Sequence, residues 1–394
     1  MCILGGILKE CTWLGEIVVD VCKQELCTGC FACQDICPEK CITMQEGSLG
    51  HIYPVCDESI CIDCGLCNKV CQGLHPLERS LPKKTYAAWN KDLEEQKTSS
   101  SGGISALLAK ACIQNGGVVY GAAFNEKWEV EHIRCTTEDA CKKIRKSKYV
   151  QSHINEQFIA IKKDLTAGKS VIFYGTPCQV GGLNRFLMKP YENLLTVDLI
   201  CHGAPSRKIY LEEIRKLAKM DGLKNITFRG NYGKGYGYGF GFFYENDIVK
   251  SFPLKQSYYI RGFMDGLLYR ESCYTCPYAN EKRVGDITLG DFWQIGKTLP
   301  FENPEKRRVS LVLVNNEKGE QWINKIKDNV FLEERSLDEA KAGNPQLRTP
   351  AKQPKNYKIF KKLYPKFRLH MAGAIAYPKM TIRLLLQKLH IVRK

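Results

Sequence analysis

The chain has 394 residues, enough for two or three domains of about 150 residues each. It is 44% hydrophobic and 25% charged, which excludes a disordered chain and allows large cores. No apolar run is long enough for a transmembrane helix, and Met1–Leu8 lacks the basic start of a signal peptide, so we expect a cytoplasmic protein. In such a protein, 20 cysteines favour metal binding over disulfides.

Residues 1–80 contain 13 of the cysteines and a tandem repeat with an offset of 34 positions. Each copy carries the spacing Cys-x-x-Cys-x-x-Cys-x-x-x-Cys. This spacing is typical of proteins with two 4Fe–4S clusters, in which three thiolates bind three iron atoms of one cluster and the fourth thiolate binds the other cluster. Zinc knuckles and disulfides are the alternatives, but zinc sites favour two separated pairs. The segment resembles bacterial two-cluster ferredoxins over residues 22–75. We therefore expect two 4Fe–4S clusters, one held by Cys27, Cys30, Cys33 and Cys71 and the other by Cys61, Cys64, Cys67 and Cys37.

Three further cysteines lie near these loops. Cys22 and Cys56 are at equivalent positions of the two repeats. We interpret them as apolar strand positions, because free cysteine behaves as a small hydrophobic residue. Cys41 is interpreted in the same way. Gln72 follows Cys71 where proline is usual, which affects the exit turn and not ligation.

Ser80–Lys84 is predicted to be a linker, followed by alternating strand and helix patterns over residues 85–230. Residues 104–114, 157–167 and 208–220 are predicted helices, and residues 118–124, 170–174 and 194–200 are predicted strands. This alternation favours a parallel α/β sheet. Residues 231–335 are rich in glycine and aromatics and are predicted to be mostly strand, as the second part of the same domain. Gly233–Gly241 is predicted to form a hairpin, because no helix pattern follows it as a nucleotide-binding loop requires.

The fold class that we predict is mixed, α+β or α/β. It combines a two-cluster ferredoxin-like domain, an α/β domain with a β section rich in glycine and aromatics, and a basic helical tail from residue 340 to residue 394.

A second cysteine set follows the predicted strands of the middle region. Cys178 and Cys201 each come just after a strand, and the carboxyl ends of parallel strands form a ligand crevice. Cys273 and Cys276 form a Cys-x-x-Cys pair further along the chain. The four thiolates would suffice for a third 4Fe–4S cluster, whereas the pair alone could bind zinc, shuttle electrons as a dithiol or have no role.

These segments, taken together, resemble the beta subunits of coenzyme F420-reducing hydrogenases and dehydrogenases. The matching pieces cover residues 85–335 in family order and are Ser99–Gly103, Ser147–Ser152, Gly175–Gln179, Cys201–Ser206, Cys273–Pro277 and Gly285–Trp293. The resemblance implies FAD beside a 4Fe–4S cluster in this domain and supports the third cluster. A flavin accepts electrons singly and delivers them in pairs, and the protein places and tunes it.

The flavin contacts that we expect come from three of these pieces: Ser100, Ser101, Gly102, Gly103, Lys148, Gly175, Thr176 and Gln179. The small residues precede a helix N-terminus, which suits a phosphate, although an ordinary N-cap explains them equally. Lys148 could stabilise a reduced anionic flavin or belong to a solvated helix face.

Two further residues are considered for roles at this site. His202 is the one catalytic candidate, as a proton relay, with a packed histidine as the alternative. Arg283 could bind an anionic cofactor or form a surface ion pair.

The basic tail carries most of the charge. The net charge is +16, and residues 340–394 contain 14 Lys and Arg with no Asp or Glu, which leaves +2 for the rest of the chain. Leucines at 384–386 and 389 beside Arg383 and Lys388 predict a basic amphipathic helix. It could lie on the inner membrane surface, dock on a partner or pack on the body. No recognition motif for nucleic acid accompanies the charge.

The function that we predict is an iron–sulfur flavoprotein oxidoreductase. Electrons would pass from reduced ferredoxin or a similar carrier through the clusters to FAD, and on to an organic or deazaflavin (coenzyme F420) acceptor, or in reverse. The alternatives are an electron-transfer subunit of a larger complex, with no substrate of its own, and a zinc-stabilised binding protein.

Overall fold

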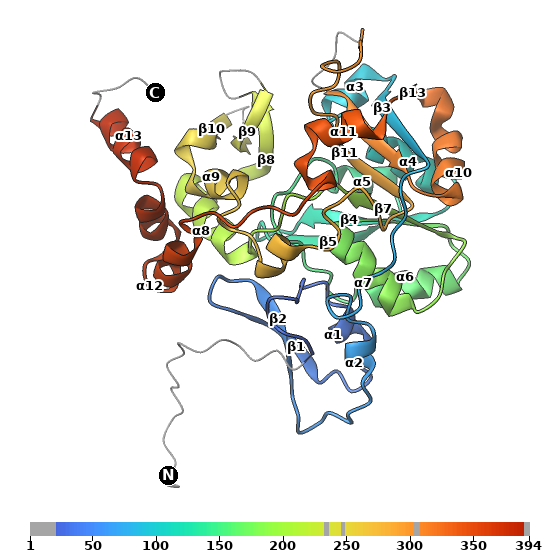
Figure 1. Cartoon of the computed structure of the whole chain (residues 1–394), viewed down its shortest axis with the longest axis horizontal. Helices are drawn as coiled ribbons and strands as arrows, with labels where there is room; N and C mark the ends of the chain where they lie inside the picture. Colours follow the sequence, from blue (N-terminus) through green and yellow to red (C-terminus); the bar gives the residue numbers. More distant parts are fainter. Residues whose placement is uncertain (1–20, 232–235, 246–248, 303–307, 390–394) are drawn as a thin grey trace.

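The computed structural model describes residues 21–231, 236–245, 249–302 and 308–389. The first 20 residues of the predicted ferredoxin domain and the last five of the tail lie outside this range. Figure 1 shows three parts: a cysteine-rich segment at the bottom, a large sheet with helices on both faces, and a smaller sheet beside the C-terminal helices.

The cysteine-rich segment contains α1 (Ala32–Ile36), β1 (Ile42–Glu46), β2 (Ile52–Cys56) and α2 (Leu66–Lys69). β1 and β2 pair antiparallel, with Ile42 opposite Cys56. Each helix starts from a residue with left-handed backbone, Phe31 (φ 69°) before α1 and Gly65 (φ 67°) before α2. These two residues are equivalent in the 34-residue repeat, so both cysteine loops end in the same local turn.

The large sheet has eight strands in the order β13-β3-β12-β11-β7-β6-β4-β5. The strands are β3 (Lys84–Asn90), β4 (Val118–Phe124), β5 (Val130–Cys135), β6 (Val171–Gly175), β7 (Leu194–Leu199), β11 (Ile287–Asp291), β12 (Ser310–Val314) and β13 (Val330–Glu334). The central strands β11, β7, β6 and β4 are parallel, as predicted, and the outer strands pair antiparallel. Strands from both sides of residue 231 enter this sheet, which supports our proposal that the two segments form one domain.

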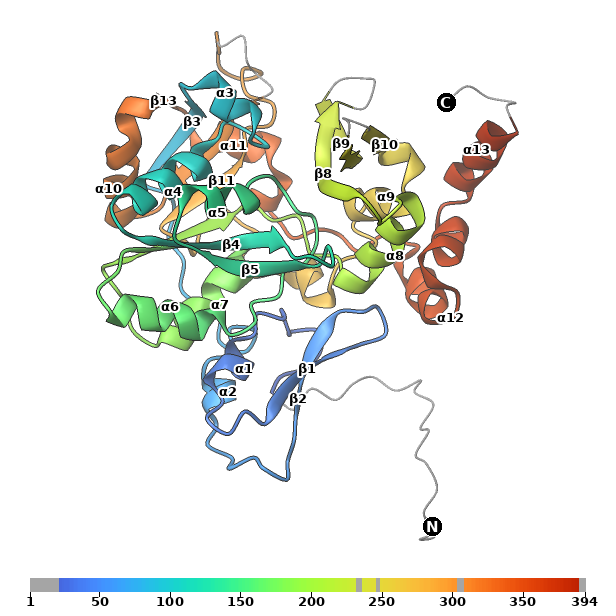
Figure 2. The same ribbon diagram turned by 180° about the vertical axis from the view of Figure 1, so that it is seen from behind.

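Helices cover both faces of this sheet (Figures 1 and 2). On one face, α6 (Gln157–Thr166) and α7 (Pro177–Leu187) bury Phe158 and Leu183 with α1 of the cysteine-rich segment. On the other face, α4 (Ile104–Gln114), α5 (Glu138–Lys143) and α10 (Glu317–Ile326) form a second core. Short helices α3 (Leu93–Lys97) and α11 (Leu337–Gly343) pack near β3. The cysteine-rich segment therefore docks beneath α7, on one face only.

The smaller sheet has the order β10-β9-β8, with β8 (Leu223–Asn231), β9 (Tyr236–Tyr244) and β10 (Val249–Pro253) all antiparallel. It confirms the predicted hairpin, and Phe240 and Phe242 of β9 are fully buried. α8 (Arg207–Leu217), α9 (Tyr258–Met264) and α12 (Tyr357–Ala376) share that core, and α13 (Pro378–Lys388) follows α12. The expectation of mostly strand in residues 231–335 is wrong in part, because α9, α10 and the 3-10 turns Leu254–Gln256, Glu271–Thr275 and Lys327–Asn329 also lie there.

Candidate redox site

The carboxyl ends of three strands meet at one edge of the large sheet. β6 and β7 run parallel with Gly175 opposite Asp198, so the segments that follow them leave at the same edge. β3 points the same way, because β12 is antiparallel both to β3 and to β11, and β11 is parallel to β7. The loop after β3 therefore brings Ser99–Gly103 to this edge, where a cavity of about 370 Å³ opens.

The second cysteine set converges in the wall of this cavity. Cys178 lies in the first turn of α7, Cys201 follows β7, and Cys273 and Cys276 lie in and just after the turn Glu271–Thr275. Burial, together with the neighbouring thiols, raises the pKa of Cys178 to about 11 and that of Cys273 to about 12. Four convergent thiols at the end of parallel strands fit the donor set of a 4Fe–4S cluster.

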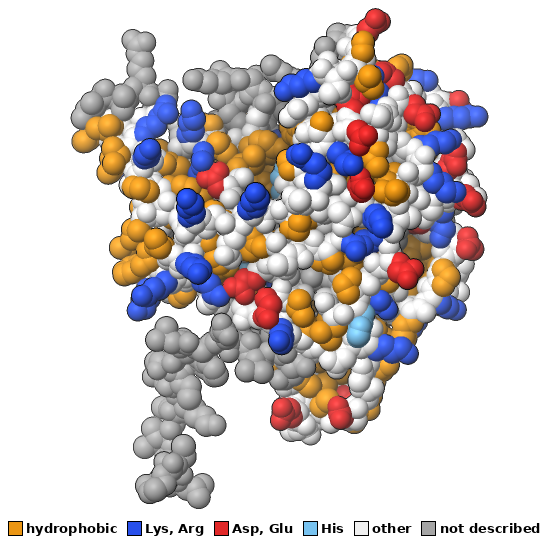
Figure 3. Space-filling model, in the orientation of Figure 1, with side chains coloured by type: hydrophobic (Ala, Val, Ile, Leu, Met, Phe, Trp, Pro, Cys, Tyr) orange, Lys and Arg blue, Asp and Glu red, His pale blue; other side chains and the backbone are white. Residues whose placement is uncertain are grey.

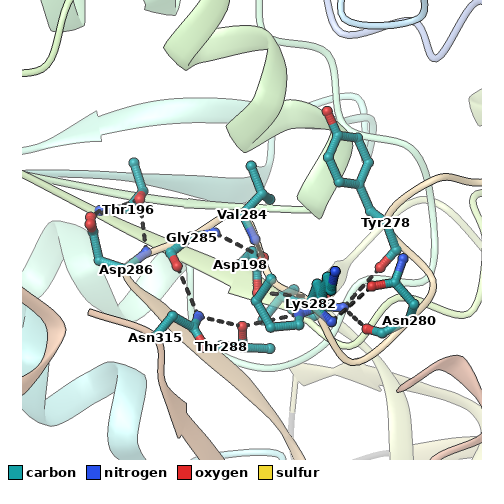
Figure 4. Close-up of polar contacts among 12 residues, drawn as sticks. Thr196, Asp198, Tyr278, Asn280, Lys282, Val284, Gly285, Asp286, Thr288 and Asn315 are labelled. Carbon is teal, nitrogen blue, oxygen red and sulfur yellow. Dashed lines mark hydrogen bonds and ion pairs between the residues drawn. The ribbon is translucent and has the colours of Figure 1, made fainter. Parts of the chain in front are cut away.

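A buried ion pair ties the loop that follows Cys276 to the end of β7 (Figure 4). Arg283 donates to Asp198 at 3.2 Å and both side chains are at most 1% exposed. The same carboxylate accepts the backbone N–H groups of Val284 and Gly285, and Thr196 donates to Asp286 through both its backbone N–H and its hydroxyl. These contacts fix the loop between Cys276 and β11 relative to Cys201.

Arg283 itself has no capacity left for a ligand. Its guanidinium also donates to Thr288 Oγ1 and to the backbone carbonyls of Leu199, Tyr278 and Asn280. Both expectations for Arg283 are therefore wrong. Its N–H groups are already used within the protein, and its ion pair with Asp198 is buried and not at the surface.

The loop before α4 contributes Ser100, Ser101 and Gly103 to the cavity lining. Gly102 does not line it, because this residue packs on β3 and its N–H donates to Ser310 Oγ. The N-cap of α4 is Gly103 (φ 86°), and no side chain caps the helix. The N–H groups of this helix end thus face the cavity without a side-chain acceptor, as a phosphate site requires.

Lys148 lies in the cavity wall. Its Nζ donates to the carbonyl of Arg145 at 2.8 Å and lies 5.6 Å from the centre of the Phe124 ring. Burial, with a smaller effect of Lys146, lowers its pKa to about 7. A buried lysine whose contacts are backbone carbonyls and an aromatic ring, with a second lysine nearby, suits an anionic ligand that would restore its charge.

The segment Gly175–Gln179 also lines the cavity, but its side chains are bonded within the protein. Thr176 and Gln179 form a capping box at the start of α7. Gln179 Nε2 also donates to the hydroxyl of Ser152 at 3.0 Å. What remains for a ligand is the backbone of this turn.

His202 is next to Cys201 in the same cavity. Burial lowers its pKa, and Asp291 partly opposes that effect. Its ring lies 6.5 Å from that of Phe263. Gly203, which follows, has φ 137°, and an added Cβ would lie 2.3 Å from the Tyr269 ring, so only glycine fits there.

The first predicted ferredoxin set is buried and close together. Cys27, Cys30, Cys33 and Cys71 are each at most 9% exposed. Cys22 was expected to be an apolar strand position, but it lies outside any strand and its thiol hydrogen-bonds Cys27 and Cys71. That contact lowers the pKa of Cys27 to about 7 and that of Cys71 to about 6.

The second predicted set is more open. Cys61 and Cys64 are exposed, and Cys67 interacts with Cys64 and Cys37. Cys41 and Cys56 join this set, because the Sγ atoms of Cys41, Cys56 and Cys61 all lie within 4.8 Å of one another. Sequence spacing missed these two thiols, since the antiparallel pairing of β1 and β2 brings them together.

The two regions meet at Cys30. An added Cβ at Gly182 would lie 2.9 Å from Cys30 Sγ, so α7 packs directly on the first ferredoxin loop. Cys178 lies four residues before Gly182, one turn away on the same face of α7. Cys178 and the contact of Gly182 with Cys30 are therefore about one helical turn apart, or ~6 Å along α7.

Arg270 bridges the same two regions and was not predicted. It is 1% exposed, donates to Gln151 Oε1, to the carbonyl of Ile52 and to that of Cys27, and stacks 4.7 Å from the centre of the Tyr53 ring. Its Nη1 also donates to Cys27 Sγ at 4.0 Å, and its other hydrogen-bond partners are uncharged oxygens. The charge of Arg270 lowers the pKa of Cys27, after the larger effect of Cys22. A buried cation of this kind needs nearby negative charge, which cluster thiolates would supply.

The sequence and structure match known proteins. Residues 168–340 match the family model for the C terminus of the beta subunit of coenzyme F420 hydrogenase/dehydrogenase. One subunit of the F420H2 dehydrogenase of Methanosarcina mazei is 21% identical over 337 residues, which is 80% of this chain and 87% of that protein. A chain of the F420-reducing NiFe hydrogenase complex from Methanosarcina barkeri aligns with a TM-score of 0.47 and 18% identity, over 76% of this chain and 93% of that one.

The fold and site define a mixed α/β protein with four cysteines in the wall of a cavity at a sheet edge and a cysteine-rich segment packed beside it. The chain is thus similar, over residues 168–340, to the C terminus of the beta subunits of coenzyme F420 hydrogenases and dehydrogenases.

Proposed function

We propose that the chain is an iron–sulfur flavoprotein oxidoreductase. Two 4Fe–4S clusters are held by the ferredoxin cysteines, a third by Cys178, Cys201, Cys273 and Cys276, and FAD occupies the cavity. Electrons enter from reduced ferredoxin or a similar carrier and leave to an organic or deazaflavin acceptor, or run in reverse. When bound, the flavin exchanges single electrons on the cluster side and electron pairs on the acceptor side.

The observation that carries this proposal is the position of Cys178. It faces the cavity beside the three other thiols, and it lies one turn of α7 from the contact between Gly182 and Cys30. The cysteines therefore form a continuous series from the exposed Cys61 and Cys64 to the cavity wall. On the cavity side, the start of α4 and Lys148 suit a phosphate and an anionic ring.

The residues of the cavity have separate tasks in this proposal. The N–H groups at the start of α4 bind phosphate, and Lys148 orients and neutralises the anion. Arg283 and Asp198 hold the loop that follows Cys276 in place. His202 lies within the cavity as the proton-relay candidate, and burial keeps it neutral, so it can accept a proton.

The test uses full-length protein prepared without oxygen and mixed with reduced ferredoxin. We expect the visible absorbance of the flavin to bleach, and Cys178→Ala to lose one cluster and slow the bleaching by at least about tenfold, or ~1.4 kcal/mol of barrier. Cys112→Ala is the matched control, because Cys112 is a core residue of α4. Equal cluster content in both variants would contradict the proposal.

The alternative, an electron-transfer subunit, is favoured by one observation: the Methanosarcina mazei relative is named as one subunit of a dehydrogenase. The two functions differ in one measurement. An enzyme reduces a free acceptor alone, whereas a subunit without its own substrate bleaches its flavin but turns over an acceptor only with its partner present.

A further inference from the structure

The C-terminal helices present a surface that the redox function does not use. α12 packs on α8 and α9 through Tyr357, Phe360, Tyr364 and Leu369, so the first tail helix is fixed to the body. α13 is different, because none of its residues is buried. Tyr258 and Thr381 hydroxyls lie 2.9 Å apart and anchor this helix at one point. The α12–α13 surface is therefore a fixed part of the molecule.

Apolar side chains on this surface remain in contact with water. Ile382, Leu385 and Leu389 are 57%, 54% and 67% exposed, at the i, i+3 and i+7 positions of one helix face. α12 is kinked at Arg368 (φ 58°), and after the kink Met371 and Ile375 lie four residues apart and are 55% and 52% exposed. Exposed aliphatic residues repeated at helical spacing indicate a surface that some partner covers.

Positive charge surrounds these side chains. Lys366, Lys379, Arg383 and Lys388 are exposed, and none of the four forms an ion pair among the described residues. At the left edge of Figure 3, basic and apolar side chains share the surface over α12 and α13. Residues 340–394 contain no Asp or Glu, whereas the first 339 residues carry a net charge of only +2. The occupant of this surface must therefore be anionic.

We propose that the α12–α13 surface binds an anionic lipid leaflet, with the basic residues at the headgroups and Ile382, Leu385 and Leu389 in the acyl boundary. A lipid surface offers both dense negative charge and an apolar layer below it, which is the combination that these helices display. No described helix is long and apolar enough to cross a membrane, so the helices would lie in the plane of the interface. None of the described cavity-lining residues belongs to α12 or α13, which leaves the redox site accessible while the protein is bound.

The test measures co-flotation of the full-length holoprotein with vesicles. We expect binding to vesicles of phosphatidylglycerol and phosphatidylcholine in equal parts, at least about tenfold weaker binding to pure phosphatidylcholine, and weaker binding as salt is raised. Arg383→Glu with Leu385→Ser should lower the affinity for the anionic vesicles at least about tenfold. The cluster and flavin absorbance of this variant should stay unchanged, because both positions are exposed.

A matched control carries the same two changes on another surface helix. In α6, Ile159 is 42% exposed and Lys163 is exposed, so Ile159→Ser with Lys163→Glu alters charge and apolarity equally. This variant should bind as the original chain does. If the original chain does not bind anionic vesicles, the proposal is overturned and a protein partner is favoured. The same holds if the two variants lose affinity for these vesicles equally.

Discussion

At the scale of single residues, two buried arginines have opposite environments. Arg283 is neutralised by Asp198 and surrounded by carbonyl acceptors. Arg270 is just as buried, but apart from the Cys27 sulfur its hydrogen-bond partners are neutral amide and carbonyl oxygens. The first arrangement holds a loop in place, and the second leaves positive charge between the two cysteine regions.

Removing the charge of Arg270 should change redox properties. With Arg270→Gln we expect a more negative midpoint potential for at least one cluster, because reduction adds negative charge that this cation stabilises. Arg270→Lys should recover most of the potential. Redox titration followed by electron paramagnetic resonance measures both, and an unchanged potential in the Gln variant would show that Arg270 only packs.

Breaking the Asp198–Arg283 pair should cost stability. Asp198→Asn leaves a buried guanidinium without its counter-charge, which lowers the free energy of unfolding by about 3–5 kcal/mol. Urea unfolding followed by circular dichroism gives the value. Asp338→Asn removes a carboxylate that is 92% exposed in its pair with Lys341, and should change stability by less than ~1 kcal/mol. Similar losses in the two variants would contradict the role of burial.

At the scale of elements, the start of α4 and Lys148 form the proposed anion site. Their proximity depends on the strand order, since β3 and β7 must point the same way. Burial gives Lys148 a pKa of about 7, below its ordinary value of 10.5. The unfolded chain therefore binds this proton more tightly than the folded chain does. The free-energy cost of burying the charged lysine decreases as pH rises above about 7.

FAD affinity should depend on pH for this reason. An anionic ligand favours protonated Lys148, so the affinity of flavin-free protein for FAD should fall above pH ~7, by at most about tenfold per pH unit. Fluorescence titration measures the dissociation constant. Lys148→Gln should bind FAD more weakly at pH ~6, and its affinity should no longer change with pH. Lys143→Gln, on the exposed side of α5, should keep the pH dependence of the original chain. A slope that persists in Lys148→Gln would assign the titration to another group.

Sequence patterns predicted the central strands and helices well, because buried strands and capped helices have local signals. The antiparallel outer strands, which pair residues far apart in the chain, have no such signal. At the site, the convergence of Cys178 and Cys201 followed from the rule that strands end at one edge. Arg270 and Cys22 could not be found in this way, since a sequence does not show which arginine is buried or which thiol faces another loop. Gln151, which bonds Arg270, lies in a segment that the family resemblance had marked.

At the scale of the whole molecule, the cysteine-rich segment lies below the large sheet, and α12 and α13 lie beside the smaller sheet (Figure 1). The cysteine-rich segment docks on α7, so under the proposed function electrons that enter at its exposed loops would have a short route to the cavity. α12 packs on α8 and α9, in the core that also contains the smaller sheet. None of the described cavity-lining residues belongs to α12 or α13, so the proposed lipid surface and the proposed redox site would not compete for the same residues.

The most direct test of this account is native mass spectrometry of the full-length protein, purified without oxygen. The account predicts a mass equal to the chain with three 4Fe–4S clusters and one FAD, and the loss of one cluster in Cys201→Ala. Two clusters without flavin would contradict it, because the four thiols that line the cavity would then not be ligands.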